Sequence, residues 1–194
     1  MVDRSRRRAA AVAGHAGDAE AARELLGDPD PAVRATALGA LGRLGQAGAT
    51  DVRAALADPS PQVRSRACRV AVSVPGVDLT GMLDDADPRV VEVAAWALGE
   101  RGEASAGAVD VLTAVATGHD DPLCREAAVA ALGAIGDEAG LAAVLSATRD
   151  KPAVRRRAVI ALAAFDGPEV DAALDAALKD RDWQVRQAAE DLRS

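Results

Sequence analysis

The chain has 194 residues, a length that suits one ordinary domain or one short array of repeats. Apolar residues make up 49% of it and charged residues 27%, a balance typical of a folded globular protein. The net charge of −7 argues against a surface that is basic throughout, and no stretch holds the roughly 18 consecutive apolar residues that cross a bilayer. With no Tyr, one Phe and two Trp, the abundant Ala, Leu, Arg and Glu favour helix and make an all-β fold unfavourable.

A short motif recurs along the whole chain. It stands as Asp-Pro-Asp-Pro-Ala-Val-Arg at 28–34 and returns as Asp-Pro-Ser-Pro-Gln-Val-Arg at 58–64. Related versions follow at 85–91, 120–125, 150–155 and 180–186. The positions that mark it are separated by 30, 27, 34, 30 and 31 residues: Pro31, Pro61, Pro88, Pro122, Pro152 and Trp183. A near-constant step of this size indicates a repeat architecture.

Each repeat has the sequence pattern of a helix pair. An Asp before the proline can cap the first helix, whose opening turn tolerates proline because the missing N–H has no intrahelical partner. Apolar residues follow at helical spacing, and a glycine such as Gly45, Gly102 or Gly136 closes the helix. A second helix then precedes the next turn. We therefore expect thirteen helices and no sheet, as pairs over about 3–27, 31–57, 61–84, 88–118, 122–149 and 152–179, with a terminal helix at 183–193.

The motif and the Ala-Leu-Gly stretch after it resemble the short bacterial HEAT-like repeats also found in phycobilisome lyase subunits. The matching residues include 37–42, 95–100 and 131–136, and the resemblance spans about 17–192. It implies an all-α fold, a right-handed α-solenoid of about six HEAT-like helix pairs plus a terminal helix, forming one domain over 1–194. It also implies that the first helices lie on the convex side and that the second helices line a concave groove.

The Arg that ends the motif allows two interpretations. It recurs as Arg34, Arg64, Arg125, Arg155 and Arg186, while Val91 interrupts the series. These residues could bind phosphates, or each could pair with a turn Asp and tie neighbouring repeats together. Because the Arg recurs once per repeat beside an Asp, we favour the structural role. The dense basic runs at 4–8 and 155–157 could contact nucleic acid or acidic protein, but we favour solvated helix faces. Trp96 is interpreted as a core residue.

No catalytic constellation is present in the sequence. There is no His-Glu-x-x-His, Walker loop, Gly-x-Ser-x-Gly or Cys-x-x-Cys, and the absence of any His-Glu pair argues against the HEAT-like di-iron hydroxylases that act on hypusine precursors. Cys68 and Cys124 have no metal-type spacing and are expected to be buried, reduced thiols. We expect a cytoplasmic protein that is not an enzyme and has no cofactor or metal.

Charge divides between the two sets of helices. The first-helix segments sum to +11 and the rest of the chain to −18, which predicts an acidic groove on the second helices. Such a groove favours a scaffold or adaptor that binds a basic or mixed-charge protein or peptide and makes nucleic acid an unfavourable partner. The expected contact residues are Glu20, Arg23, Arg53, Asp78, Asp110, Thr113, Asp171 and Asp175. The alternatives are a HEAT-like alkyl-base DNA glycosylase, whose DNA-binding face is basic, and a bilin lyase-type chaperone subunit.

Overall fold

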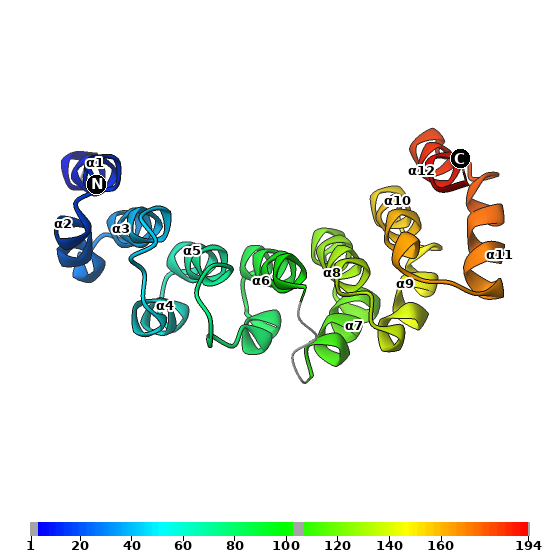
Figure 1. Ribbon diagram of the computed structural model, residues 1–194, viewed down its shortest axis with the longest axis horizontal. Coiled ribbons are helices and arrows are strands. Elements are labelled where there is room, and N and C mark those ends of the chain that lie inside the picture. The colour runs from blue at the N-terminus through cyan, green and yellow to red at the C-terminus, as the bar shows by residue number, and fades with distance from the viewer. Residues whose placement is uncertain (1–3, 103–106, 194) are drawn as a thin grey trace. The chain divides into compact units, whose positions relative to one another are not determined.

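The computed structural model describes residues 4–102 and 107–193, and within these ranges all regular secondary structure is helical. The chain divides into two compact units, Met1–Ala97 (unit 1) and Leu98–Ser194 (unit 2), which are described separately. The predicted all-α repeat fold is confirmed. In each unit the first helices of consecutive repeats stack side by side, which is the packing of an α-solenoid (Figure 1).

Unit 1 contains three complete first helices. The helices are α1 (Arg4–Ala16), α2 (Ala19–Glu24), α3 (Pro31–Arg43), α4 (Ala49–Leu56), α5 (Pro61–Ala71) and most of α6 (Pro88–Arg101). α3 packs between α1 and α5, while α2 and α4 pack against the first helices from the other side (Figure 1). Residue 3, where the first pair was expected to begin, lies outside the described residues.

One element of unit 1 corrects the sequence expectation. The second helix expected within 61–84 is a 3₁₀ helix, Thr80–Asp84, so the described residues contain twelve α-helices instead of thirteen. The cause is length, because this repeat has the shortest step, 27 residues, from Pro61 to Pro88. Gly76 adopts a positive φ of 70° in the connection, and the few residues after it are too short for a stable α-helix.

Unit 2 repeats the same arrangement. Its helices are α7 (Ala108–Gly118), α8 (Pro122–Ile135), α9 (Leu141–Ala147), α10 (Pro152–Ala161), α11 (Pro168–Ala177) and α12 (Trp183–Arg193). α10 packs between α8 and α12, and α7, α9 and α11 are the second helices (Figure 1). Every marker proline is the first residue of a first helix, and Trp183 begins the terminal helix, as predicted.

Local chemistry explains where the helices start and stop. The Asp30 carboxylate accepts a hydrogen bond from the Ala32 N–H at 2.9 Å, and Asp121 does the same for Leu123 at 2.9 Å. Each satisfies one of the N–H groups that has no partner in the first turn. At the other end, Gly45 and Gly136 adopt positive φ values of 65° and 67°, a conformation that glycine adopts without steric cost.

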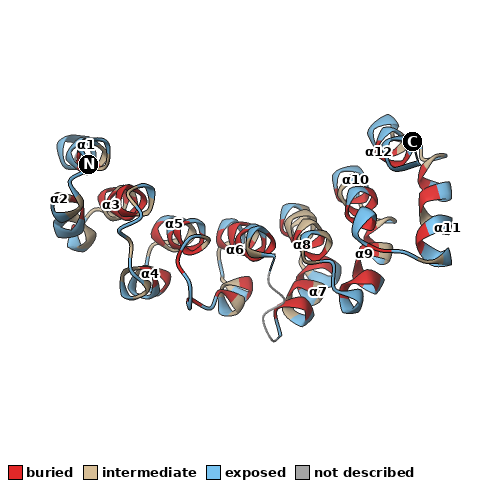
Figure 2. Ribbon diagram, in the orientation of Figure 1, coloured by how far each residue is buried: buried red, intermediate tan, exposed pale blue. Residues whose placement is uncertain are grey.

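The core is built from small residues that let first helices approach closely. The Gly of the Ala-Leu-Gly stretch lies at this contact: a Cβ on Gly42 would lie 2.9 Å from Val70, and one on Gly133 would lie 2.6 Å from the Cβ of Ala161. Leucines such as Leu41 and Leu132 fill the space between the layers and are fully or almost fully buried. Figure 2 shows buried residues on the sides of the helices that face their neighbours and exposed residues on the outer sides.

Candidate functional site

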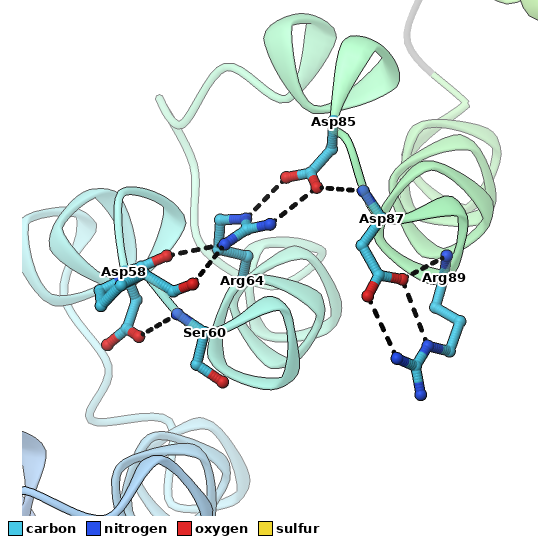
Figure 3. Close-up of polar contacts among 7 residues, drawn as sticks. Asp58, Ser60, Arg64, Asp85, Asp87 and Arg89 are labelled. Carbon is cyan, nitrogen blue, oxygen red and sulfur yellow. Dashed lines mark hydrogen bonds and ion pairs between the residues drawn. The ribbon is translucent and has the colours of Figure 1, made fainter.

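The repeated Arg forms a clamp between consecutive repeats, shown for Arg64 in Figure 3. Its guanidinium donates from Nε and Nη2 to the two Asp85 carboxylate oxygens, at 2.6 and 2.8 Å. Its Nη1 donates to the carbonyl oxygens of Asp58 at 2.9 Å and Pro59 at 3.1 Å. One side chain therefore holds the turn before its own helix and the turn of the following repeat.

The same bidentate geometry recurs in both units. Arg34 donates from Nε and Nη2 to the Asp58 carboxylate, Arg125 does so to Asp150, and Arg155 does so to Asp180. Every nitrogen–oxygen distance in these pairs lies between 2.6 and 2.9 Å. Arg155 is itself a buried residue. The terminal Arg186 donates only to the Asp180 carbonyl, at 2.7 Å. The structure therefore places the sequence-predicted Arg ladder between turns, where its guanidinium groups are already occupied.

These clamps shift the pKa of their members. The hydrogen bond from the partner Arg holds the pKa of Asp85, Asp150 and Asp180 below its ordinary value. For Asp58, burial alone would raise the pKa, but hydrogen bonds from Arg34 and the Ser60 N–H outweigh it, so the pKa is lowered. Both partners of each clamp therefore stay charged at neutral pH.

Two features of the turns were not predicted from the sequence. These are a further clamp and the different roles of the two Asp residues in a turn. Arg6, in the repeat that lacks the Val-Arg motif, lies 3.0 Å from the Asp28 carboxylate, and Asp28 is buried. Within the turns, the first Asp receives the clamp and the second caps the helix, as Asp28 and Asp30 illustrate. The recurrence of an Asp three residues before the marker residue, at Asp28, Asp58, Asp85 and Asp180, was the signal that could have revealed this, although Asp150 lies two residues before Pro152.

One junction lacks both clamp residues. Val91 occupies the position of the Arg and is buried, while His119 occupies the position of the following Asp. His119 keeps one function of that Asp, since its Nδ1 accepts a hydrogen bond from the Asp121 N–H at 3.0 Å. Val91 belongs to unit 1 and His119 to unit 2.

A second group of arginines in unit 1 is not used in clamps. Helices α1, α3 and α5 carry nine Arg and no Asp or Glu, and three of the nine, Arg6, Arg34 and Arg64, form clamps. The other six are all exposed, and none forms an ion pair with another residue that the structure describes. We call them the arginine face: Arg4, Arg7, Arg8, Arg43, Arg66 and Arg69.

The arginine face lines two clefts on the first-helix side of unit 1. One, of about 600 Å³, is lined in part by Arg7, Arg66 and Arg69, and the other, of about 410 Å³, by Arg4, Arg7, Arg8, Arg43 and Arg66. The two share Arg7, Thr36 and Arg66 in their linings, so they lie next to each other. Partial burial of the guanidinium, followed by the charges of Arg69 and Arg43, lowers the pKa of Arg66. Arginine therefore predominates in both linings, and Asp87, at the larger cleft, pairs with Arg89.

Both tryptophans are exposed, and for Trp96 this corrects the sequence expectation. Trp96 was interpreted as a core residue, but 38% of it is exposed, and the guanidinium carbon of Arg69 lies 5.3 Å from its ring centre. This distance is typical of a cation–π contact. Trp183 is 65% exposed at the start of α12, where it lines a cleft with Ile160 and Leu192.

The residues expected to bind a partner through the second helices are scattered and partly engaged. Arg23 donates to the Gln46 carbonyl at 2.9 Å, and Arg53 donates to the Gly76 carbonyl at 2.6 Å, so both brace the next repeat. Asp78 accepts from the N–H and the hydroxyl of Thr80.

The other members differ in exposure and in available charge. Asp171 and Asp175 lie together on α11, but Arg193 forms ion pairs with both, at 3.2 and 2.7 Å. Glu20 and Asp110 are exposed. Thr113 is only partly exposed, and its hydroxyl oxygen is buried without a hydrogen-bond partner among the described residues. None of these eight residues lines either cleft of the arginine face or the two described clefts of unit 2.

The described residues were also searched for metal ligands and for membrane-spanning helices. They contain no group of three or more His, Cys, Asp or Glu side chains placed to hold a metal ion, and no helix among them could span a membrane. Cys68 and Cys124 are buried, and neither forms a disulfide among the described residues.

Comparisons with known proteins agree with this fold. A family model described as HEAT repeats matches residues 3–72, 78–153 and 109–193. No curated protein matches the chain in sequence. Among solved structures, Escherichia coli YibA is similar with a TM-score of 0.73 and 18% identity, over 94% of this chain and 70% of YibA.

Two further structures show the range of proteins that share the fold. Human deoxyhypusine hydroxylase is similar with a TM-score of 0.52 and 22% identity, over 99% of this chain and 80% of the enzyme. A designed armadillo repeat protein in complex with the peptide (KR)4 has a TM-score of 0.55 and 17% identity, over 98% and 89% of the two chains. At these identities the likeness concerns the fold alone.

Proposed function

Because the chain belongs to the HEAT-repeat family, we propose that it is a non-catalytic scaffold that binds an acidic segment of a protein partner on the arginine face. The observation that carries this proposal is the set of six exposed arginines on α1, α3 and α5 that pair with no acidic residue among those the structure describes. Arg is common at protein interfaces, and its fork matches a carboxylate in a bidentate manner. An acidic segment would supply carboxylates to these arginines.

The clamps support the proposal by showing what an arginine with a structural role looks like in this protein. Four clamp guanidiniums each make a bidentate bond to one carboxylate, with side chains no more than 17% exposed. The arginine face has neither property. A charged peptide bound to a designed armadillo protein of similar fold also supports the idea that such stacks hold extended segments, although that peptide is basic.

The test compares two charge reversals of equal size. A fluorescein-labelled peptide of alternating Glu and Gly serves as the probe, and its anisotropy is titrated with the full chain at several salt concentrations. Arg66→Glu should weaken binding by about tenfold or more and flatten its salt dependence, because Arg66 lines both clefts. Arg156→Glu, on an exposed residue of α10 in unit 2, is the matched control and should leave the affinity unchanged. Equal losses in both variants would refute the proposal.

The acidic second-helix surface stays a separate prediction, with a basic or mixed-charge segment as its ligand. Asp171→Lys together with Asp175→Lys should abolish such binding, measured by the same method with a Lys-Gly peptide. Because both residues pair with Arg193, thermal unfolding of the double variant must be measured beside the affinity. Unchanged affinity in a folded variant would exclude this surface. We also propose that the protein works in the cytoplasm, since neither Cys68 nor Cys124 forms a disulfide among the described residues.

A further inference from the structure

Arg66 occupies the centre of the arginine face. It lines both clefts, and its side chain lies against the α3 backbone, where a Cβ on Gly39 would be 3.3 Å from the Arg66 Cδ and Nε atoms. Arg43 and Arg69 are close enough for their charges to act on it. Three guanidinium groups therefore lie near one another at the two clefts, and Asp87, which lines the larger cleft, is already paired with Arg89.

The neutral groups of the larger cleft are suited to an anion with several acceptor oxygens. Ser60, Gln62 and Ser65 line it and offer donors beside the guanidiniums of Arg66 and Arg69. A carboxylate brings one charge and two oxygens to such a site. A phosphate monoester brings a charge of about −1.5 to −2 and three oxygens, so it can satisfy several forks at once.

The basic surface is short. Asp87 lines the edge of the larger cleft, where its carboxylate binds Arg89 at 3.1 Å. On α6, the positions in register with Ser65, Arg66 and Arg69 are Glu92, Val93 and Trp96, so the run of arginines ends there. An extended nucleic acid backbone requires a longer track of positive charge. A single phosphate group within a peptide fits the three helices better.

We infer that the arginine face recognises a phosphorylated Ser or Thr within the acidic segment of its partner, with Arg66 as the central contact. This inference rests on the proposed function and narrows its ligand. Clusters of Arg are a recurring solution for phosphopeptide recognition. Binding would then be controlled by phosphorylation of the partner, since the unmodified segment lacks the doubly charged group.

The experiment uses three labelled peptides of one acidic Asp-Gly background, which carry phosphoserine, serine or glutamate at a central position. The phosphoserine peptide should bind the full chain about tenfold more tightly than the glutamate peptide, because it adds charge and acceptor oxygens. Arg66→Gln should remove this preference while the glutamate peptide loses much less affinity. Arg156→Gln should preserve it.

The possible failures are distinguishable. Equal affinity for the phosphoserine and glutamate peptides would overturn the inference and leave the proposed function intact. Absence of binding to all three peptides would overturn both. A single-stranded oligonucleotide of similar charge, used as a fourth probe, would overturn the inference if it bound more tightly than the phosphopeptide, since the surface would then be a nucleic-acid site.

Discussion

Removal of one clamp should destabilise unit 1 far more than removal of a similar-looking surface pair beside it. Figure 3 contains both cases. Arg64 and Asp85 are 17% and 6% exposed in their side chains, whereas the Arg89 side chain, which pairs with Asp87, is 81% exposed. In each pair the guanidinium makes two contacts with the carboxylate. The pairs therefore differ in burial and in the bonds that Arg64 makes to the preceding turn.

The expected loss of unfolding free energy follows from the few interactions that Asp85 retains in Arg64→Ala. Asp85 would remain almost buried as an anion, with only the Asp87 N–H, at 2.9 Å, of the bonds seen here. Hydrogen bonds to charged groups contribute about 1.5–3 kcal/mol each, and breaking a buried pair costs about 3–5 kcal/mol. Since Arg64 keeps some solvent access, we expect a loss of about 2–4 kcal/mol. Arg64→Lys should recover only part of it, because an ammonium cannot match the bidentate geometry.

The assay is urea unfolding of the full chain, followed by circular dichroism and by Trp96 fluorescence in a Trp183→Phe background, so that the signal reports on unit 1. Arg64→Ala should lower the midpoint by roughly 1–2 M at a typical urea dependence for a domain of this size. Arg89→Ala should leave the midpoint unchanged. Comparable shifts in the two variants would refute the reasoning that the clamps hold the repeats together.

Three further predictions follow from the packing and the clamps. Gly133→Ala should destabilise unit 2 by about 1–3 kcal/mol in thermal unfolding, because the new methyl group meets Ala161, whereas Gly118→Ala, which faces open space, should be neutral or slightly stabilising. Acid titration should show stability lost as the pH falls below about 4, since the lowered pKa values of the clamp carboxylates make their contribution complete only above the unfolded value. Cys68 and Cys124 should react with a thiol reagent only after unfolding, because both are buried, and fast reaction of the native chain would contradict the packing.

Much of the fold was predictable because its signals are local and repeated. Proline marks, capping Asp residues and closing glycines each act within one helix turn, so their positions fixed the starts of the first helices. The replacement of an α-helix by a 3₁₀ helix before Pro88 was harder to predict from the sequence. Few residues remain between Gly76 and Pro88, and several of them, such as Thr80 and Gly81, are poor helix formers, so only a 3₁₀ helix forms.

The candidate site was harder to predict, because its key property is which charges remain unpaired. The sequence shows nine Arg on three helices, but only the structure separates Arg6, Arg34 and Arg64 in clamps from the rest. The helix charge sums treated both groups alike, which drew attention to the acidic second helices. Trp96 was misjudged for a similar reason, since the register that places it on an exposed edge depends on the neighbouring helix.

The helix α12 carries charge at positions that are apolar and buried in the preceding repeat. Val159 in α10 and Leu162, directly after α10, are buried, but the positions in register on α12 are Glu190 and Arg193, and both are exposed. Each earlier first helix of unit 2 has a side against which the next first helix packs. Glu190 and Arg193 make such packing unfavourable, since it would bury the Glu190 carboxylate and cover the ion pairs that Arg193 forms with Asp171 and Asp175. Their replacement by Val and Leu would add exposed apolar surface to unit 2, and we expect the variant to self-associate more readily.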